Sequence, residues 1–264
     1  MQEDKLLRAE QDAKFIKMTT EPVQKLVVEL AIPTIFSMMV TSFYNTVDTF
    51  FVSQLGTSAS AAVGVNFAFM SIIQAIGFFF GHGSGNYISR KLGSKERDKA
   101  DIMASSGYFY AFGAGLLLIL ICWPLADKLA VALGSTPTIL PYAQTFLQII
   151  ILGAPFMMSS LVLNNQLRFQ GSAMYGMVGI TSGAILNIFL EPLLIFYCGL
   201  GIAGAAMATV FSQFVGMCVL LAMARRGGNL SIHWRKVQLS VRLFKEIVMG
   251  GAPSLFRQGL ESVG

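Results

Sequence analysis

The stretch Ser182-Gly-Ala-Ile-Leu-Asn187-Ile-Phe-Leu-Glu191-Pro192-Leu-Leu-Ile-Phe196 decides how this 264-residue chain is interpreted. It lies in an apolar run long enough to cross a bilayer, yet it contains an amide, Asn187, and a carboxylate, Glu191. These two residues are four positions apart, so on a helix they share one face. An ionised group in hydrocarbon costs roughly 3 kcal/mol or more. We therefore interpret this face as an ion or substrate site.

The composition predicts an all-α membrane protein. The mean hydropathy is +0.63 and 54% of the residues are hydrophobic. Only 12% are charged, against about 25% in soluble domains, and long apolar runs recur. The net charge of +5 does not indicate a nucleic-acid partner, because Lys and Arg gather in the cytoplasmic loops of membrane proteins. The expected surroundings are the lipid bilayer.

Six apolar runs are each predicted to form a membrane-spanning helix. Prolines predict kinks in the first and fifth of them, at Pro33 and Pro192. The polar segment 164–171 is predicted to be a loop after the fourth, and the basic segment 90–99 a loop after the second. The six runs are 26–54, 61–80, 104–126, 139–163, 174–197 and 202–224.

The distribution of Lys and Arg predicts the orientation of the chain. The N-terminal segment and the loops after the second and sixth helices carry nearly all of these residues, so the N-terminus is expected in the cytoplasm of a cell-membrane protein. The predicted organisation has four parts: a cytoplasmic segment over 1–25, a six-helix lobe over 26–225, a cytoplasmic loop over 226–242, and the start of a second lobe over 243–264.

A short internal repeat suggests that the chain is half of a larger protein. The segment Lys25…Ile32-Pro33-Thr34-Ile35 matches Lys245…Ala252-Pro253-Ser254-Leu255 at a constant offset. Such a match is expected where a second six-helix repeat follows in the same orientation. A coincidental proline-bearing helix start is the alternative. We expect the missing C-terminal lobe to be a partner of this chain.

Four polar residues are predicted to meet in one layer of the membrane. At a rise of 1.5 Å per residue, Asp48 and Glu191 both lie about 9 Å below the outer ends of their helices. Thr209 lies about 10 Å down, and Asn187 lies roughly one turn deeper than Glu191. These oxygen ligands suit Na⁺, and two acids can hold a proton between them. The alternative is that each group is satisfied separately and only holds helices together.

Several motifs resemble those of the multidrug and toxic compound extrusion (MATE) transporters. The loop-like stretch Asn164-Asn-Gln-Leu-Arg-Phe-Gln-Gly-Ser-Ala173 is similar to the bacterial branch of that family. The other motifs are Asn187-x-x-x-Glu191-Pro192, Gly201-x-Ala-Gly204-Ala-Ala-x-Ala208-Thr209-x-x-Ser212-Gln213, Val47-Asp48-Thr-Phe-Phe51 and Gly85-Asn-x-x-Ser-Arg-x-Leu92-Gly93.

The resemblance implies twelve helices in two six-helix lobes that form a V, of which this chain is the N-terminal lobe and the start of a seventh helix. It implies an antiporter that exports small cationic drugs and is driven by H⁺ or Na⁺, with no other cofactor. The cation site of the family's N-terminal lobe falls on Asp48, Asn187, Glu191 and Thr209, and Na⁺ is a possible ligand there. Glu191 stands where many relatives have Asp, which leaves the coupling ion open.

Two other functions remain as alternatives. A lipid-linked-precursor flippase of the same architecture would hold its anionic substrate with basic residues, whereas the six complete spans carry acids. A non-transporting scaffold or receptor would tolerate Glu191→Gln. No serine-histidine-acid set or HExxH motif indicates an enzyme, and Gly81-x-Gly83-x-Gly85 follows a membrane helix instead of the strand that a phosphate loop requires.

Overall fold

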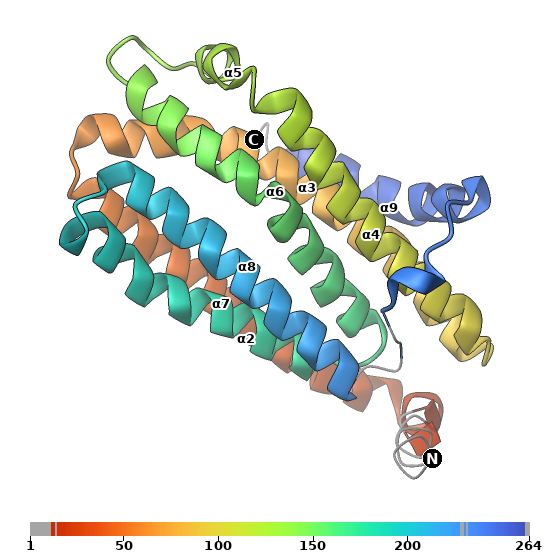
Figure 1. The fold of residues 1–264 in the computed structure, drawn as a ribbon. Coiled ribbons are helices and arrows are strands. Elements are labelled where there is room, and N and C mark those ends of the chain that lie inside the picture. The colour runs from red at the N-terminus through yellow and green to blue at the C-terminus, as the bar shows by residue number, and fades with distance from the viewer. Residues whose placement is uncertain (1–11, 14, 228–229, 231, 262–264) are drawn as a thin grey trace.

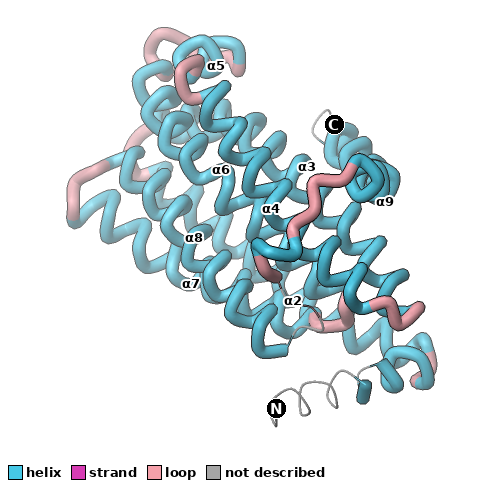
Figure 2. Tube along the Cα trace, turned by 45° about the vertical axis from the view of Figure 1, so that its right-hand side comes forward, coloured by secondary structure: helices cyan, strands magenta, loops and turns pink. Residues whose placement is uncertain are grey.

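The computed structural model describes residues 12–13, 15–227, 230 and 232–261, and the regular structure of these residues is helical (Figure 2). Six stretches are long and apolar enough to cross a membrane, as predicted: α2, α3, α4, α6, α7 with the turn after it, and α8. The elements are α2 (Val23–Ser53), α3 (Thr57–Gly93), α4 (Arg97–Cys122), α5 (Ala126–Ala132), α6 (Leu140–Phe169), α7 (Ala173–Pro192), a π-helical turn (Leu193–Tyr197), α8 (Gly201–Gly227), a 3-10 turn (Trp234–Lys236) and α9 (Val241–Glu261) (Figure 1).

Helix α6 is the centre of the bundle. In its most apolar 18-residue window 72% of the residues are buried, against 39% or less in the other five spans. It packs against α3 and α4 on one side and against α7 and α8 on the other, and α2 packs against α7 (Figure 1). Its fully buried side chains include Leu147, Ile150, Ile151 and Met158. The other spans keep apolar side chains on the outside of the bundle, as membrane helices require.

The predicted loop over 164–171 is wrong for most of its length. Helix α6 continues to Phe169, and the turn occupies only 170–172. The amide nitrogens of Asn165 and Gln166 donate to groups inside the bundle, whereas their buried amide oxygens have no donor among the described residues. The Gln166 side-chain nitrogen donates to Ser84 Oγ and to the Ala104 carbonyl, both at 3.1 Å, and Asn165 donates to the Leu161 carbonyl at 2.8 Å.

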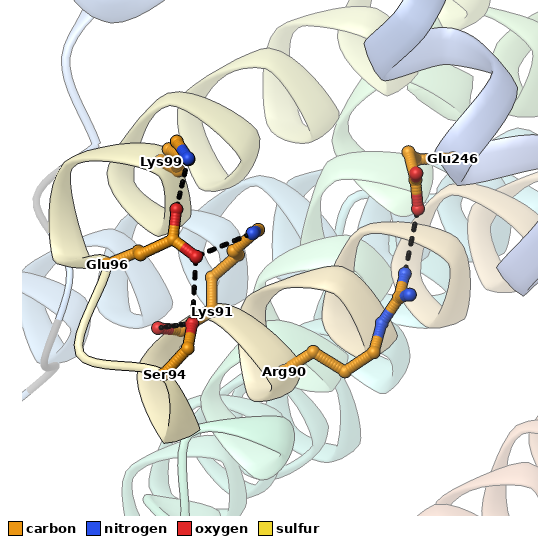
Figure 3. Close-up of polar contacts among 6 residues, drawn as sticks. All are labelled: Arg90, Lys91, Ser94, Glu96, Lys99 and Glu246. Carbon is orange, nitrogen blue, oxygen red and sulfur yellow. Dashed lines mark hydrogen bonds and ion pairs between the residues drawn. The ribbon is translucent and has the colours of Figure 1, made fainter.

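The predicted basic loop over 90–99 is also shorter than expected. Helix α3 runs to Gly93 and α4 begins at Arg97, so only Ser94–Glu96 connect them. Hydrogen bonds from Lys91 Nζ, at 2.8 Å, and from Lys99 hold the Glu96 carboxylate beside this turn (Figure 3). These bonds lower the pKa of Glu96 to about 2. The three-residue connection therefore keeps the ends of α3 and α4 adjacent.

The glycines at 81, 83 and 85 lie inside α3 and are positions of close helix packing. A Cβ atom at Gly85 would lie 2.2 Å from the Phe169 ring, and one at Gly83 would lie 2.3 Å from the backbone oxygen of Ile247. Both distances are too short for a side chain. The glycine spacing therefore serves contacts with α6 and α9.

The crossing of α4 and α6 offers a test of this packing. A Cβ at Gly115 would lie 2.4 Å from Pro155 Cα, so Gly115→Ala must push two backbones apart, and we expect a loss of about 1–3 kcal/mol in the free energy of unfolding. The measurement is thermal unfolding of the full-length protein in detergent. Gly113→Ala is the matched control, because nothing lies within 4 Å of its Cβ position. Equal unfolding temperatures for the two variants would contradict this account.

Candidate functional site

The C-terminal parts of α2 and α7 and the N-terminal part of α8 carry the predicted site. Helix α2 packs on α7, and the short turn between α7 and α8 makes those helices neighbours. A Cβ at Gly204 would lie 2.7 Å from the backbone carbonyl of Leu194, so the start of α8 lies directly against the π-helical turn. The rings of Phe51 and Phe196 meet edge to face, with centroids 6.2 Å apart, and join α2 to that turn.

Two carboxyl groups meet between α2 and α7. The Asp48 side chain from α2 lies within hydrogen-bonding reach of the Glu191 side chain from α7. Glu191 is 0% exposed, whereas Asp48 is half-buried. Neither Glu191 oxygen accepts a bond from a nitrogen or hydroxyl donor in the part of the chain that the structure describes. Two carboxyl groups so close form a hydrogen bond only when one of them holds a proton, and otherwise they need a cation between them.

The amide and the hydroxyl extend this cluster toward α8. Asn187 Nδ2 lies 3.5 Å from Thr209 Oγ1, which itself donates to the Ala205 carbonyl at 3.1 Å. Both side chains are buried. Asn187 Oδ1 accepts no hydrogen bond from the described residues, so it is a third buried oxygen without a donor. We refer to Asp48, Asn187, Glu191 and Thr209 together as the carboxyl layer.

The carboxyl layer lacks a positive charge. A buried acceptor without a donor costs about 1–3 kcal/mol, and an uncompensated carboxylate costs more. Within the described residues, no Lys, Arg or His side chain forms an ion pair with Asp48 or Glu191. The atoms of the carboxyl layer that could coordinate a cation are all oxygens, which fits Na⁺ or a bound proton. The residues present are therefore suited to binding a small monovalent cation.

Sequence reasoning missed one member of this neighbourhood, Tyr44. It lies one helical turn before Asp48, and it interacts electrostatically with the carboxyl groups of Asp48 and Glu191. The four-residue spacing was a signal that could have identified it. Asn45, by contrast, is exposed and lies in a shallow groove with Ser42 and Thr49 on the surface of α2, away from the carboxyl layer.

The two prolines lie at different kinds of position. Pro33 is buried inside α2, ten residues after its start, and Pro192 is the last residue of α7. Since proline has no N–H group, the carbonyl of Ile188 loses its helical donor one turn before Pro192. The following five residues continue as a π-helical turn instead of an α-helix. The helix is thus irregular next to Glu191.

Six apolar helices that enclose a pair of carboxyl groups define a multi-pass membrane protein with the features of a transporter lobe. Residues 33–193, more than half of the chain, match the MatE family model. The chain belongs to the MatE family, whose members are transporters and not enzymes.

Relatives and solved structures agree with this assignment. The chain is 26% identical over 245 residues to multidrug export protein MepA from Staphylococcus aureus (strain MRSA252). The matched region covers 92% of this chain and 54% of the relative. A MOP superfamily transporter from Pyrococcus furiosus and an outward-facing MATE family multidrug resistance transporter each superpose with a TM-score of 0.85 and 28% identity, over 92% of this chain and 54% of theirs. The chain thus spans about half the length of the relatives it matches.

The carboxyl layer predicts a cation-dependent stability. Adding Na⁺ or lowering the pH should raise the unfolding temperature of the full-length protein in detergent, because either cation supplies the charge that the layer lacks. A cation concentration 100 times the dissociation constant would add about 2.7 kcal/mol to the free energy of unfolding. Glu191→Gln should abolish the response, since it keeps the size of the side chain and removes its charge.

Glu96→Gln is the control for this measurement, because Glu96 lies in the turn outside the membrane spans and bonds to Lys91 and Lys99. It should keep the full response. A full Na⁺ or pH response in the Glu191→Gln protein would show that cations stabilise the molecule elsewhere.

Proposed function

We propose that this chain is the N-terminal lobe of a cation-coupled antiporter that exports cationic drugs across the cell membrane. The observation that carries the proposal is the carboxyl pair of half-buried Asp48 and fully buried Glu191, in contact and without a positive partner among the described residues. Family membership and a relative named a multidrug export protein support the same conclusion. The coupling ion is H⁺ or Na⁺, and no other cofactor is required.

The coupling follows from competition for one negative site. A cation bound by Asp48, Asn187, Glu191 and Thr209 neutralises the layer and lets α2 pack closely on α7. A cationic drug that approaches the same charge is released when the coupling ion binds. Transport in one direction requires that the ion binds the two conformations of the protein with different affinity. Pro33, buried within α2, is a point at which that helix can change its bend.

The membrane orientation is part of the proposal. We place the N-terminus and the turn between α3 and α4 in the cytoplasm, because both are rich in basic residues. Contacts between the two segments support a common side. Arg97 pairs with Asp12 at 2.9 Å, and the Lys95 ammonium lies 4.9 Å from the centre of the Phe15 ring. The complete protein then has a cytoplasmic segment over 1–25, this lobe over 26–225 and a connecting loop over 226–242.

The missing partner is a second six-helix lobe. Helix α9 (Val241–Glu261) contains Pro253 in its interior, just as α2 contains Pro33. Coverage of about half of the relatives supports the assignment of 243–264 to the beginning of that lobe. The drug cavity forms only when both lobes are present, so the proposed activity belongs to the complete protein.

Dye efflux from inverted membrane vesicles tests this proposal. The complete protein should export a cationic dye under an imposed Na⁺ or proton gradient, and the effective gradient identifies the coupling ion. Glu191→Gln and Asp48→Asn should each reduce gradient-driven efflux roughly tenfold or more, because both remove the charge that couples ion and drug. Each variant keeps one acid of the pair, so dye binding without a gradient should persist in both, with lower affinity than in the wild type.

Glu96→Gln is again the matched acid-to-amide control, and it should transport at the wild-type rate. Normal gradient-driven efflux by the Glu191→Gln protein would remove the carboxyl layer from the mechanism. An absence of efflux by the wild-type protein under either gradient would favour a scaffold or receptor.

A further inference from the structure

The segment between α8 and α9 is bound along the surface of α4. Residues 232–240 cross α4 as an extended chain with one 3-10 turn (Figure 1). The backbone N–H of His233 donates to Ser105 Oγ, and that of Gln238 donates to Ser106 Oγ, both at 3.1 Å. Both serine side chains are fully buried. Two hydroxyl groups inside the lobe therefore have the connecting segment as a hydrogen-bond partner.

Asp101 holds the same segment at its middle, and Tyr110 holds it near its C-terminal end. The Tyr110 hydroxyl donates to the Gln238 carbonyl and accepts from the Ser240 N–H at 3.3 Å, while Asp101 pairs with Lys236. On α4, Asp101 and Ser105 are four positions apart, and so are Ser106 and Tyr110, so the members of each pair share a helix face. Most of these bonds involve the backbone of the segment, so they fix its path and not only its side chains.

Helix α9 then joins the hydrophobic core of the preceding helices. Leu243 and Ile247 are buried in the same cluster as side chains of α3, α4 and α6. The Phe244 ring lies 6.4 Å from the Tyr110 ring, which links the segment and the helix. The first two turns of α9 are thus packed as a seventh helix of the first lobe.

Glycines allow α9 and α3 to touch through their backbones. A Cβ at Gly251 would lie 2.2 Å from the backbone oxygen of Phe79, and one at Gly83 would lie 2.3 Å from that of Ile247. Small residues at such crossings give membrane helices their closest packing. At the rim of this contact Arg90 pairs with Glu246 at 2.8 Å (Figure 3), and Asn86 Nδ2 donates to the Gly250 carbonyl at 3.4 Å.

We propose that residues 232–240 and the first half of α9 (Val241–Gly251) form a clamp that keeps α9 attached to the first lobe throughout transport. The two lobes of the complete protein then move against each other beyond Gly251, and not at the connecting loop. Separation of the connecting segment from α4 would break its hydrogen bonds to Ser105 and Ser106, and separation of α9 from α3 would expose the backbone contact at Gly83. This inference rests on the proposed transport function, because it assigns the parts that move.

A disulfide between α3 and α9 tests the clamp. A Cβ at Gly250 lies 3.4 Å from the Asn86 Cβ, close to the separation of about 3.8 Å in disulfides. The complete protein should carry Asn86→Cys and Gly250→Cys in a background without Cys122, Cys198 and Cys218, which are all free thiols. The oxidised double variant should cross-link fully and export dye within about twofold of its reduced form, because hinge motion elsewhere is unaffected.

The two single-cysteine variants, oxidised in the same way, are the controls. A fall in efflux of roughly tenfold on cross-linking, reversed by a reductant, would show that α3 and α9 must separate and would overturn the clamp. Failure of the pair to cross-link would overturn it as well, because α9 would then not lie on α3. Loss of efflux in the reduced protein and in its cysteine-free parent would instead count against the transport function.

Distance measurement tests the clamp without relying on transport. Spin labels at the exposed positions Ser89 of α3 and Lys245 of α9 should give one distance distribution in nanodiscs. The clamp predicts the same distribution with and without Na⁺, at acid and at alkaline pH, and with bound dye. A second population longer by about 5 Å or more in any of these conditions would contradict it.

Discussion

The fully buried Glu191 carboxyl group is the constraint on which the arrangement of this lobe depends. It lies between membrane helices, its oxygens have no hydrogen-bond donor among the described residues, and its polar neighbour is a second acid, Asp48. An ion in such a place is costly unless something compensates its charge. The packing of α2 on α7 and the close approach of α8 at Gly204 exclude other donors and keep the carboxyl layer small.

The lobe combines the carboxyl layer, which lacks a positive charge, with closely packed helices around α6. The Gln166 side-chain nitrogen on central helix α6 donates to α3 and α4, and the close contacts at Gly115 and Gly83 hold neighbouring helices together. Irregular structure is found beside the carboxyl layer, where Pro192 ends α7 and a π-helical turn begins. In the proposed mechanism, the cation binds beside this irregular end of α7. It changes the conformation of the lobe only if it binds the two conformations with different affinity.

Much of this was predictable from the sequence. Hydropathy located all six spans, since each apolar run had to be helical in a membrane, and helical rise placed Asp48, Asn187, Glu191 and Thr209 at similar depths. The polar run 164–169 was wrongly predicted to be a loop, because the Gln166 amide nitrogen donates to Ser84 and Ala104, which are distant in sequence. Contacts of this kind have no local signature. The binding of 232–240 to Ser105 and Tyr110 could not be predicted for the same reason. Tyr44, by contrast, could have been identified, because it lies four residues before Asp48 on the same helix.

The central claim is that a small cation and a cationic drug exclude each other at the carboxyl layer. The most direct measurement is the number of Na⁺ ions or protons released when a cationic dye binds the complete protein. Calorimetry in buffers of different ionisation enthalpy measures proton release, and a Na⁺ electrode measures Na⁺ release. The account predicts that wild-type protein releases Na⁺ or protons on binding the dye, and that the Glu191→Gln protein binds the dye and releases none. Equal release from the two proteins would show that drug and ion meet at another site, and it would contradict the account.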